Sequence, residues 1–302
     1  MSVSSPEIAN SMRSRAIAVI RSLPKVRGRG RLAKILNDGF LAAGASPIVT
    51  AKMVDGHSLV VDCRLFSHCM FLFNGVTGIE DLLSLLISFL KPNGVALDIG
   101  ANIGAVTVPL ALAARSKGSR VIAFEPFSKN IAWNSQNLKL NHIEDVVTMV
   151  ESGLSSEPGE ATLMLGDDFR SGATIGNAIV AQPGDNDYFE RVTIRLNTLD
   201  DLWPSFGNPR LDVIKIDIEG HESKFLEGAT QTLAANRPVI LMEVNRYWYT
   251  RRGLNFDTEI PLRLPPNYRY FTSHKTEIND LADCHQSDVL LVPEEKANQL
   301  RN

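Results

Sequence analysis

Short apolar runs alternate with stretches of helical spacing through the middle of the chain. The runs have the length and continuity of buried strands, and they lie at residues 95–99, 121–124, 146–150, 211–218 and 238–244. Because strands that alternate with helices pair in parallel, this pattern predicts a sheet covered by helices on both faces.

Two later apolar runs, at 268–272 and 288–292, predict strands that complete the sheet as a hairpin. Together with the five earlier runs they give seven core strands. The predicted fold class is therefore α/β, a Rossmann-like doubly wound seven-strand sheet, mostly parallel with an antiparallel last strand.

Helices are predicted between these strands. One, over Leu82–Leu90, leads into the first strand and ends at Lys91–Gly94. The later helices are indicated by apolar faces formed by Val106, Val108, Leu110, Leu112 and Ala113, then by Ile131, Trp133 and Leu138, and finally, after an opening at Glu219–Glu222, by Phe225, Leu226, Ala229 and Leu233.

The first 74 residues differ from the rest and predict an N-terminal helical and β-hairpin extension. Residues 11–34 hold eight basic side chains and no acid. This run fits a basic arm for an anionic surface, an organellar transit peptide, or a solvated helical pair beside the core. From Pro47 to Phe73 the periodicity falls toward two, which predicts short strands around an Asp55-Gly56 turn.

Residues 75–302 are predicted to form the main domain, with an insertion at about 153–210. The insertion is turn-rich, with hairpin pieces near 161–165 and 192–196. More than fifty residues is too long for a simple connection. The insertion either contributes to acceptor recognition or is a surface excursion without a role in the site.

Composition excludes several classes of protein. The 302 residues are 44% hydrophobic with a net charge of −3, so nothing draws the chain as a whole toward nucleic acid. The three cysteines, Cys63, Cys69 and Cys284, favour a reducing compartment. Leu82–Leu90 is too short to span a membrane, and no secretory signal is found, so we expect a cytoplasmic protein.

The turn after the first strand carries the most informative chemistry. It reads Asp98-Ile99-Gly100-Ala101-Asn102-Ile103-Gly104, which lacks one glycine of the dinucleotide-binding pattern GxGxxG. A carboxylate there would repel pyrophosphate but suits the sulfonium and ammonium of S-adenosylmethionine. Glu125, at the end of the second strand, is placed to accept hydrogen bonds from ribose hydroxyls. The plain alternative is a tight turn followed by a helix N-terminal acid.

Several acids and one imidazole follow the fourth and fifth core strands. Asp217, Glu219, His221, Glu222 and Glu243 are predicted to converge, and close carboxylates raise one another's pKa, which suits a general base. His221 and Glu222 could instead be first-turn helix residues without a catalytic role. Asp217, Glu219 and Glu243 could offer oxygen ligands to magnesium, but cofactor and base roles already account for these acids, so no metal is predicted.

A family resemblance rests on these motifs. DIGANIG at 98–104, FEP at 124–126, TLD at 198–200, KIDIEGHE at 215–222 and the strand ending at Glu243 resemble the FkbM family of S-adenosylmethionine-dependent methyltransferases. The resemblance covers about residues 75–243. It implies the class I methyltransferase fold and methylation of a hydroxyl on a sugar, glycolipid or secondary metabolite such as a macrolide.

The resemblance also implies roles for residues. A cofactor set would frame the methionine end, the ribose and the adenine of S-adenosylmethionine: Asp98, Gly100, Ala101, Asn102 and Gly104, then Glu125 and Pro126, then Ser152 and Gly153. The catalytic candidates are Asp217, His221 and Glu243, with Asp217 or His221 as the base. Ser152-Gly153 could equally be only a turn.

The predicted reaction is an in-line displacement that moves a methyl group to a hydroxyl oxygen. The expected partner is a small-molecule or glycan acceptor, with no nucleic acid and no transmembrane segment, although the basic arm allows weak peripheral membrane contact. Two alternatives remain at this point: a nicotinamide-dependent Rossmann oxidoreductase and a non-catalytic adenosyl-binding module.

Overall fold

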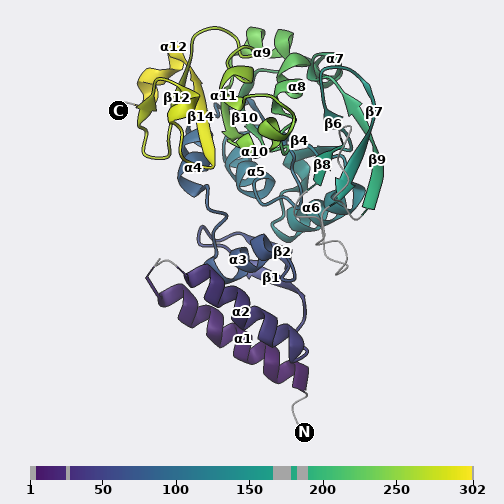
Figure 1. The fold of residues 1–302 in the computed structure, drawn as a ribbon, viewed down its shortest axis with the longest axis vertical. Coiled ribbons are helices and arrows are strands. Elements are labelled where there is room, and N and C mark those ends of the chain that lie inside the picture. Colours follow the sequence, from purple (N-terminus) through teal and green to yellow (C-terminus); the bar gives the residue numbers. More distant parts are fainter. Residues whose placement is uncertain (1–4, 25–27, 166–177, 182–189, 301–302) are drawn as a thin grey trace. The chain divides into compact units, whose positions relative to one another are not determined.

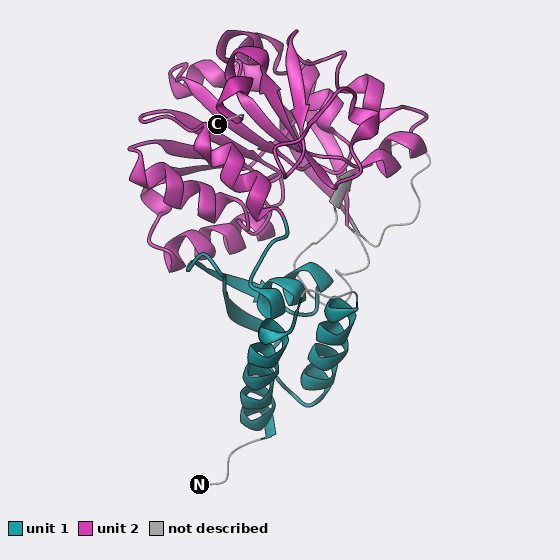
Figure 2. Cartoon of the chain, turned by 90° about the vertical axis from the view of Figure 1, so that its left-hand side faces the viewer, with its two compact units in different colours: residues 1–78, 166–176 teal, residues 79–165, 177–302 magenta. Residues whose placement is uncertain are grey.

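The computed structural model describes residues 5–24, 28–165, 178–181 and 190–300. The chain divides into two compact units (Figure 2). The described part of the first unit lies within residues 1–78, and the second unit comprises residues 79–165 and 177–302.

The first unit contains the predicted helices and hairpin. Its elements are α1 (Ser5–Ser22), α2 (Arg29–Ala42), β1 (Ile48–Lys52), β2 (Ser58–Asp62) and α3 (Phe66–Asn74). Strands β1 and β2 pair antiparallel around the Asp55-Gly56 turn. The strand-like reading up to Phe73 is wrong at its end, because α3 buries His68, Cys69, Leu72 and Phe73, a spacing that fits one face of a helix.

The second unit is built on a mixed sheet of eight strands (Figure 1). Its order is β13-β12-β14-β11-β10-β3-β4-β5, and β11, β10, β3, β4 and β5 run parallel. β14 is antiparallel to both of its neighbours. The strands are β3 (Val95–Ile99), β4 (Arg120–Phe124), β5 (Val147–Val150), β10 (Leu211–Ile216), β11 (Val239–Glu243), β12 (Tyr268–Phe271), β13 (Glu277–Ile278) and β14 (Asp288–Pro293).

This arrangement confirms the predicted α/β fold with a mostly parallel sheet and an antiparallel last strand. The two-residue strand β13 is an addition that the sequence did not predict, because a run so short has no periodicity to read. Helices connect the strands: α4 (Glu80–Ser88), α5 (Thr107–Ser116), α6 (Ser128–Leu140), α7 (Leu199–Leu202), α8 (Glu222–Glu227), α9 (Thr230–Asn236), α10 (Arg246–Arg251), α11 (Phe256–Glu259) and α12 (Glu294–Ala297).

Two helix predictions need correction. The helix after β10 begins at Glu222 rather than Glu219, and it divides into α8 and α9 around Gly228. A Cβ at Gly228 would lie 1.9 Å from the Ser155 carbonyl oxygen, so the chain approaches too closely there for any side chain. In α5 the buried face includes Ala111 and Ala114, whereas Leu112 is exposed.

The insertion forms a small second sheet. Its strands are β6 (Gly153–Leu154), β7 (Gly159–Leu165), β8 (Ala178–Val180) and β9 (Glu190–Asn197), in the order β6-β9-β7-β8. The predicted hairpin pieces are confirmed as the antiparallel pair β7 and β9, with Ala161 opposite Ile194. Residues 166–177 and 182–189 of the insertion lie outside the described residues.

Parallel pairing decides where the polar strand ends meet. β10 lies beside β3, and β4 lies on the other side of β3, so the carboxyl ends of these strands face the same edge. The first two strand runs are buried on both faces, as in β3, where every residue is buried, whereas every residue of β5 is partly or fully exposed. In the described part of the chain no helix is both long and apolar enough to cross a membrane.

Candidate active site

The turn after β3 is held by main-chain contacts to both neighbouring strands. The amides of Gly100 and Ala101 both donate to the Phe124 carbonyl oxygen, at 3.0 Å each. On the other side, a Cβ on Gly100 would lie 1.9 Å from the main-chain oxygen of Asp217, and the φ angle of Gly100 is +82°. Only glycine fits this position, since both the space and the left-handed backbone exclude other residues.

Asp98 joins the two ends of this turn. Its Oδ2 accepts a hydrogen bond of 2.6 Å from the hydroxyl of Thr107, the first residue of α5. The carboxyl is 1% exposed. Burial raises its pKa to about 6, while the Thr107 hydroxyl and the Lys215 ammonium act in the opposite direction.

Glu125 links the turn after β3, here the first turn, to the turn after β4, here the second turn. Its Oε2 accepts from the Asn102 amide at 2.8 Å, and its Oε1 accepts from the Phe127 amide at 3.0 Å. Burial raises the pKa of Glu125 to about 7, although these main-chain donors favour the charged form. Oε1 also accepts from Asn130 Nδ2 at 3.4 Å, whereas Oε2 has a second lone-pair direction and could still accept from a ribose hydroxyl. Pro126, the next residue, is half-buried.

A row of asparagines on α6 bonds to the turn after β3 and to Glu125. The sequence analysis did not predict this row. Asn134 Nδ2 donates to the Asn102 carbonyl oxygen at 3.2 Å and to the Thr107 hydroxyl at 3.1 Å. Asn137 Nδ2 donates to the Ile103 carbonyl oxygen at 2.8 Å. Asn130, one turn earlier, donates to Glu125. The spacing 130, 134, 137 on one helix face was the available signal.

Ser152 and Gly153 lie where the chain passes from β5 to the small sheet. The Ser152 hydroxyl donates to the Gly153 carbonyl oxygen at 2.7 Å and accepts from Asn197 Nδ2 at 2.8 Å. Gly153 pairs with Leu196 of β9. Both residues therefore fix the path of the chain beside the second turn, and an adenine contact stays a proposal.

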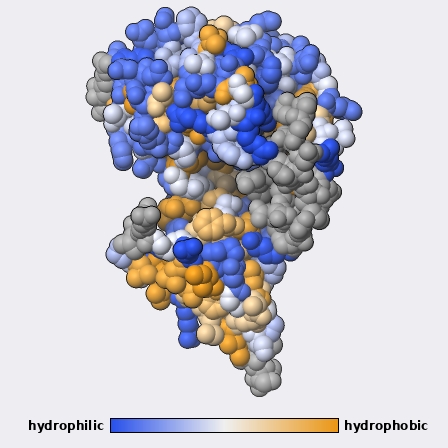
Figure 3. Space-filling view, viewed as in Figure 1, coloured by the Kyte–Doolittle hydropathy of each residue, from blue (hydrophilic) through white to orange (hydrophobic). Residues whose placement is uncertain are grey.

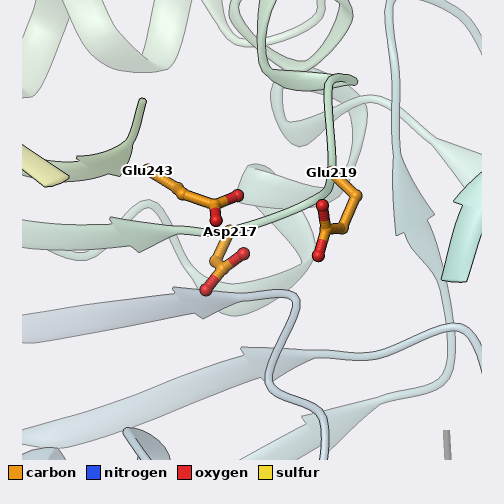
Figure 4. A group of neighbouring side chains, drawn as sticks. All are labelled: Asp217, Glu219 and Glu243. Atoms are coloured by element: carbon orange, nitrogen blue, oxygen red, sulfur yellow. The ribbon is translucent and has the colours of Figure 1, made fainter. Parts of the chain in front are cut away.

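Three acids come together at the carboxyl ends of β10 and β11. Asp217, Glu219 and Glu243 each offer an oxygen, and these oxygens lie within 4.8 Å of one another (Figure 4). Glu219 Oε2 also accepts from Asn245 Nδ2 at 2.8 Å and from the indole of Trp248 at 2.9 Å. We call Asp217, Glu219 and Glu243 the acidic cluster.

Burial and mutual repulsion change the charge of the acidic cluster. Burial, followed by the charges of Asp217 and Glu219, raises the pKa of Glu243 to about 9. Burial, followed by Asp217, raises the pKa of Glu219 to about 7. At neutral pH the cluster therefore carries fewer than three negative charges and holds at least one proton.

A buried lysine lies beside the acidic cluster. The sequence analysis gave this lysine no role. Lys215 Nζ is 2.9 Å from Asp288 Oδ1 and 3.7 Å from Asp217 Oδ2, and the side chain is 1% exposed. Although burial alone works against its charge, Asp217 and Asp288 raise the pKa of Lys215. The ammonium therefore stays charged and forms ion pairs with both Asp217 and Asp288.

His221 lies close in sequence to the acidic cluster, but its ring is bonded elsewhere. Its Nε2 is 2.9 Å from the Ser155 hydroxyl. Burial, then the nearby Arg252, lowers the pKa of His221 to about 4, so the ring is neutral at pH 7. Glu222 is fully buried, and its Oε1 accepts from the Gly220 amide at 3.0 Å.

The acidic cluster is also the place where a divalent cation could bind. Within the described residues, Asp217, Glu219 and Glu243 form the group of acids, histidines and cysteines with suitable geometry. Lys215 already supplies one positive charge at 3.7 Å from Asp217. This charge is a physical reason to expect no metal at the acidic cluster, and the absence of a metal stays a prediction.

The sheet order, the glycine turn after β3 and the acid after β4 define a class I, S-adenosylmethionine-dependent methyltransferase. More narrowly, the chain belongs to the FkbM methyltransferase family, because the family profile described as "Methyltransferase FkbM domain" matches residues 98–276. This confirms the resemblance seen in the motifs. It argues against the nicotinamide oxidoreductase.

Two curated relatives are methyltransferases. The hexuronic acid methyltransferase AglP of Haloferax volcanii is 28% identical over 164 residues, which is 54% of this chain and 62% of that protein. The methyltransferase sdnD of Sordaria araneosa is 28% identical over 167 residues, 48% of this chain and 64% of that protein. The chain thus spans less than two thirds of the length of these relatives.

A similar solved structure is the FkbM methyltransferase from Methylobacillus flagellatus. It aligns with 93% of this chain and 59% of its own, at a TM-score of 0.44 and 16% identity.

The residues of the first two turns fit the cofactor of this class. Gly100 has no room for a Cβ, and the carboxyls of Asp98 and Glu125 are both buried nearby. In the described structure the buried Oδ1 of Asn130 has no hydrogen-bond partner, although its Nδ2 contacts Glu125. Buried carboxylates and a spare acceptor suit a ligand that brings cationic groups and hydroxyls rather than phosphates.

Proposed function

We propose that this methyltransferase transfers a methyl group to a hydroxyl oxygen of a sugar-containing acceptor. The observation that carries the proposal is the acidic cluster above the buried Lys215 at the carboxyl ends of β10 and β11. A hydroxyl must lose its proton as its oxygen takes the methyl, and a carboxylate at this position can receive that proton.

Asp217 is the proposed base. Its side chain is 44% exposed, so an acceptor can reach it, and Lys215 Nζ lies 3.7 Å from its Oδ2. Its main-chain oxygen touches the glycine turn, which ties the base to the cofactor side of the site. Burial raises the pKa of both Glu243 and Glu219, and we propose that they contact neighbouring acceptor hydroxyls.

When bound, S-adenosylmethionine would supply a methyl group on a sulfonium: an O–C bond from the acceptor would form in line as the C–S bond breaks, and its electron pair would stay on the leaving thioether sulfur. The acceptor proton moves to an Oδ of Asp217. The chain positions the two reactants. Asp98, Gly100, Ala101, Asn102, Gly104, Glu125, Pro126, Ser152 and Gly153 are the proposed cofactor contacts.

His221 is the other candidate for the base, and its contacts favour a supporting role. Its ring is neutral and bonded to Ser155, which joins the start of α8 to the small sheet. We therefore propose that His221 positions the turn that carries Glu219. A base role would require the ring to turn away from Ser155.

A sugar acceptor is supported by the relative named as a hexuronic acid methyltransferase. The acidic cluster favours a hydroxyl over a carboxylate as the methylated group. An acceptor carboxylate would be repelled by Asp217, and it would need no base. A hydroxyl product is an alkali-stable ether, whereas a carboxylate product is an alkali-labile ester.

The test uses the full chain, S-adenosylmethionine with a labelled methyl group, and a panel of neutral sugars and uronic acid glycosides. We expect labelled product that survives mild alkali, and turnover unchanged by a chelator. Asp217→Asn should lower kcat by about 100-fold or more, whereas Asp201→Asn, an exposed acid on α7, should leave kcat unchanged.

Other outcomes would redirect the proposal. Label that mild alkali removes would mean carboxylate methylation. Full turnover in Asp217→Asn, combined with its loss in His221→Ala, would move the base role to His221. Loss of turnover on chelation would replace the lysine-assisted site with a metal site.

A further inference from the structure

The first unit has an apolar row on the solvent side of α1. Ile8, Met12 and Val19 are 48%, 55% and 58% exposed, and Leu23, just after the helix, is 40% exposed. At about 100° per residue, these four positions lie within an arc of about 60°. A solvent-facing helix surface is ordinarily polar, so a single apolar row of this length indicates a surface that binds something.

A groove continues this row onto α2. It has a volume of about 470 Å³ and is lined mostly by apolar residues of both helices: Ser5, Ile8, Ala9, Met12, Ile35, Leu36, Gly39, Phe40 and Ala43. Ile35 is 61% exposed. Figure 3 shows the hydrophobic residues gathered over α1 and α2. We call this row and groove together the helical face.

Charge separates this part of the chain from the rest. Residues 5–42 contain eight basic and two acidic residues, a net charge of +6, so the other residues together carry −9. Some of the basic side chains stabilise the folded first unit. Arg21, for example, donates to the carbonyl oxygens of Lys52 and Leu72. Arg15 and Arg31 are exposed, and Arg15 lies next to the apolar row.

We propose that the helical face binds the surface of an anionic phospholipid bilayer. Apolar side chains enter the boundary between headgroups and acyl chains, and the basic residues contact the anionic headgroups. The helices lie on the membrane and do not cross it, in keeping with the absence of a spanning helix among the described residues.

Charge argues for a bilayer over a second copy of the chain. Two helical faces brought together would place two regions of net charge +6 in contact, and like charges repel. An anionic bilayer offers the opposite charge and an apolar interior at once. Each basic residue near such a surface adds to the binding, and salt weakens this part.

The test is co-sedimentation of the full chain with vesicles of phosphatidylcholine alone or mixed equally with phosphatidylglycerol. We expect binding to the mixed vesicles that falls as salt is raised. Replacing the exposed residues Met12, Val19 and Ile35 together by glutamine should reduce binding by about tenfold or more. The matched control replaces three exposed leucines of the second unit: Leu140, Leu254 and Leu262.

The charge arm of the test uses Arg15→Gln with Arg31→Gln, which should lower binding to the mixed vesicles on the order of tenfold. Its control is Lys139→Gln with Lys275→Gln, two exposed lysines of the second unit. Circular dichroism checks that each variant is folded. Single variants Val19→Gln and Ile35→Gln replace the triple variant if its helices are lost.

Two results would overturn the proposal. One is wild-type protein that binds mixed vesicles no better than phosphatidylcholine vesicles. The other is a dimer, measured by light scattering, that the triple glutamine variant converts to a monomer without any change in vesicle binding. That result would assign the helical face to self-association.

Discussion

Glu243 shows how the acidic cluster opposes folding as the pH rises. Three carboxyls share one small region, and the pKa of Glu243 rises from its ordinary value of 4.5 to about 9, first because of burial and then because of Asp217 and Glu219. Between these values the folded protein keeps a proton that the unfolded chain releases. Rising pH therefore favours unfolding over this range.

A glutamine at position 243 should remove this penalty. We expect Glu243→Gln to melt a few degrees above wild type at pH 9, corresponding to about 1 to 2 kcal/mol for this half-buried group, and to match wild type near pH 5. Thermal melts across this pH range measure the difference. Glu294→Gln, at an exposed acid of α12, is the control and should show no such trend.

At the scale of residues, the sequence could predict which side chains meet where strand pairing alone decides their positions. Asp217 and Glu243 were expected to meet because parallel strands end at a common edge, and they do. Contacts between distant segments were not predictable. The His221 ring meets Ser155, 66 residues earlier, and Lys215 meets Asp288, 73 residues later, and no local pattern records either pair.

At the scale of elements, α6 connects the two turns that are proposed to hold the cofactor, the turn after β3 and the turn after β4. Its asparagines bond to the first turn through Ile103 and Asn102 and to the second through Glu125. A helix that crosses beneath both turns fixes their separation. The geometry of the cofactor site therefore depends on residues that need not touch the cofactor.

Asn137→Ala tests this dependence. Losing the bond to the Ile103 carbonyl leaves a buried acceptor unpaired, so we expect a loss of about 1 to 3 kcal/mol in the free energy of unfolding. Binding of S-adenosylmethionine should weaken about three- to tenfold, as calorimetry would show. Gln136→Ala, exposed on the same helix, should change neither quantity, and equal effects of the two variants would contradict the role of the row.

The position of α6 was predictable, but its buried face was not. Ile131, Trp133 and Leu138 correctly indicated a helix, yet the face that faces the turn is lined with amides. Hydrophobic periodicity finds helices that bury apolar residues and passes over polar faces that bond to main chain. The same limitation applies to Lys215 within the apolar strand β10.

At the scale of the whole molecule, the sheet could be predicted because short apolar runs of strand length alternate with stretches of helical spacing. The boundary between domains is less sharply marked in the sequence. The predicted boundary at residue 74 falls at the end of α3, whereas the compact units divide after residue 78.

The proposed cofactor residues all lie in the second unit, so ligand binding should stabilise the second unit more than the first. S-adenosylhomocysteine at about 100 times its Kd should stabilise the folded chain by about 2.7 kcal/mol. We expect slower hydrogen exchange in peptides covering residues 95–126 and no change over residues 5–42. Exchange mass spectrometry measures both, with NAD⁺ as the control ligand, and slowing confined to residues 5–42 would place the cofactor elsewhere.

The contact between Gly100 and the Asp217 carbonyl also limits how this enzyme can vary. In a library with all twenty amino acids at position 100, selection for activity should recover glycine almost alone, since even alanine meets a main-chain atom at 1.9 Å. Position 159, a glycine with open space around it, should accept many residues. Attempts to broaden acceptor choice by directed evolution should therefore leave position 100 unchanged and vary other positions around the acidic cluster.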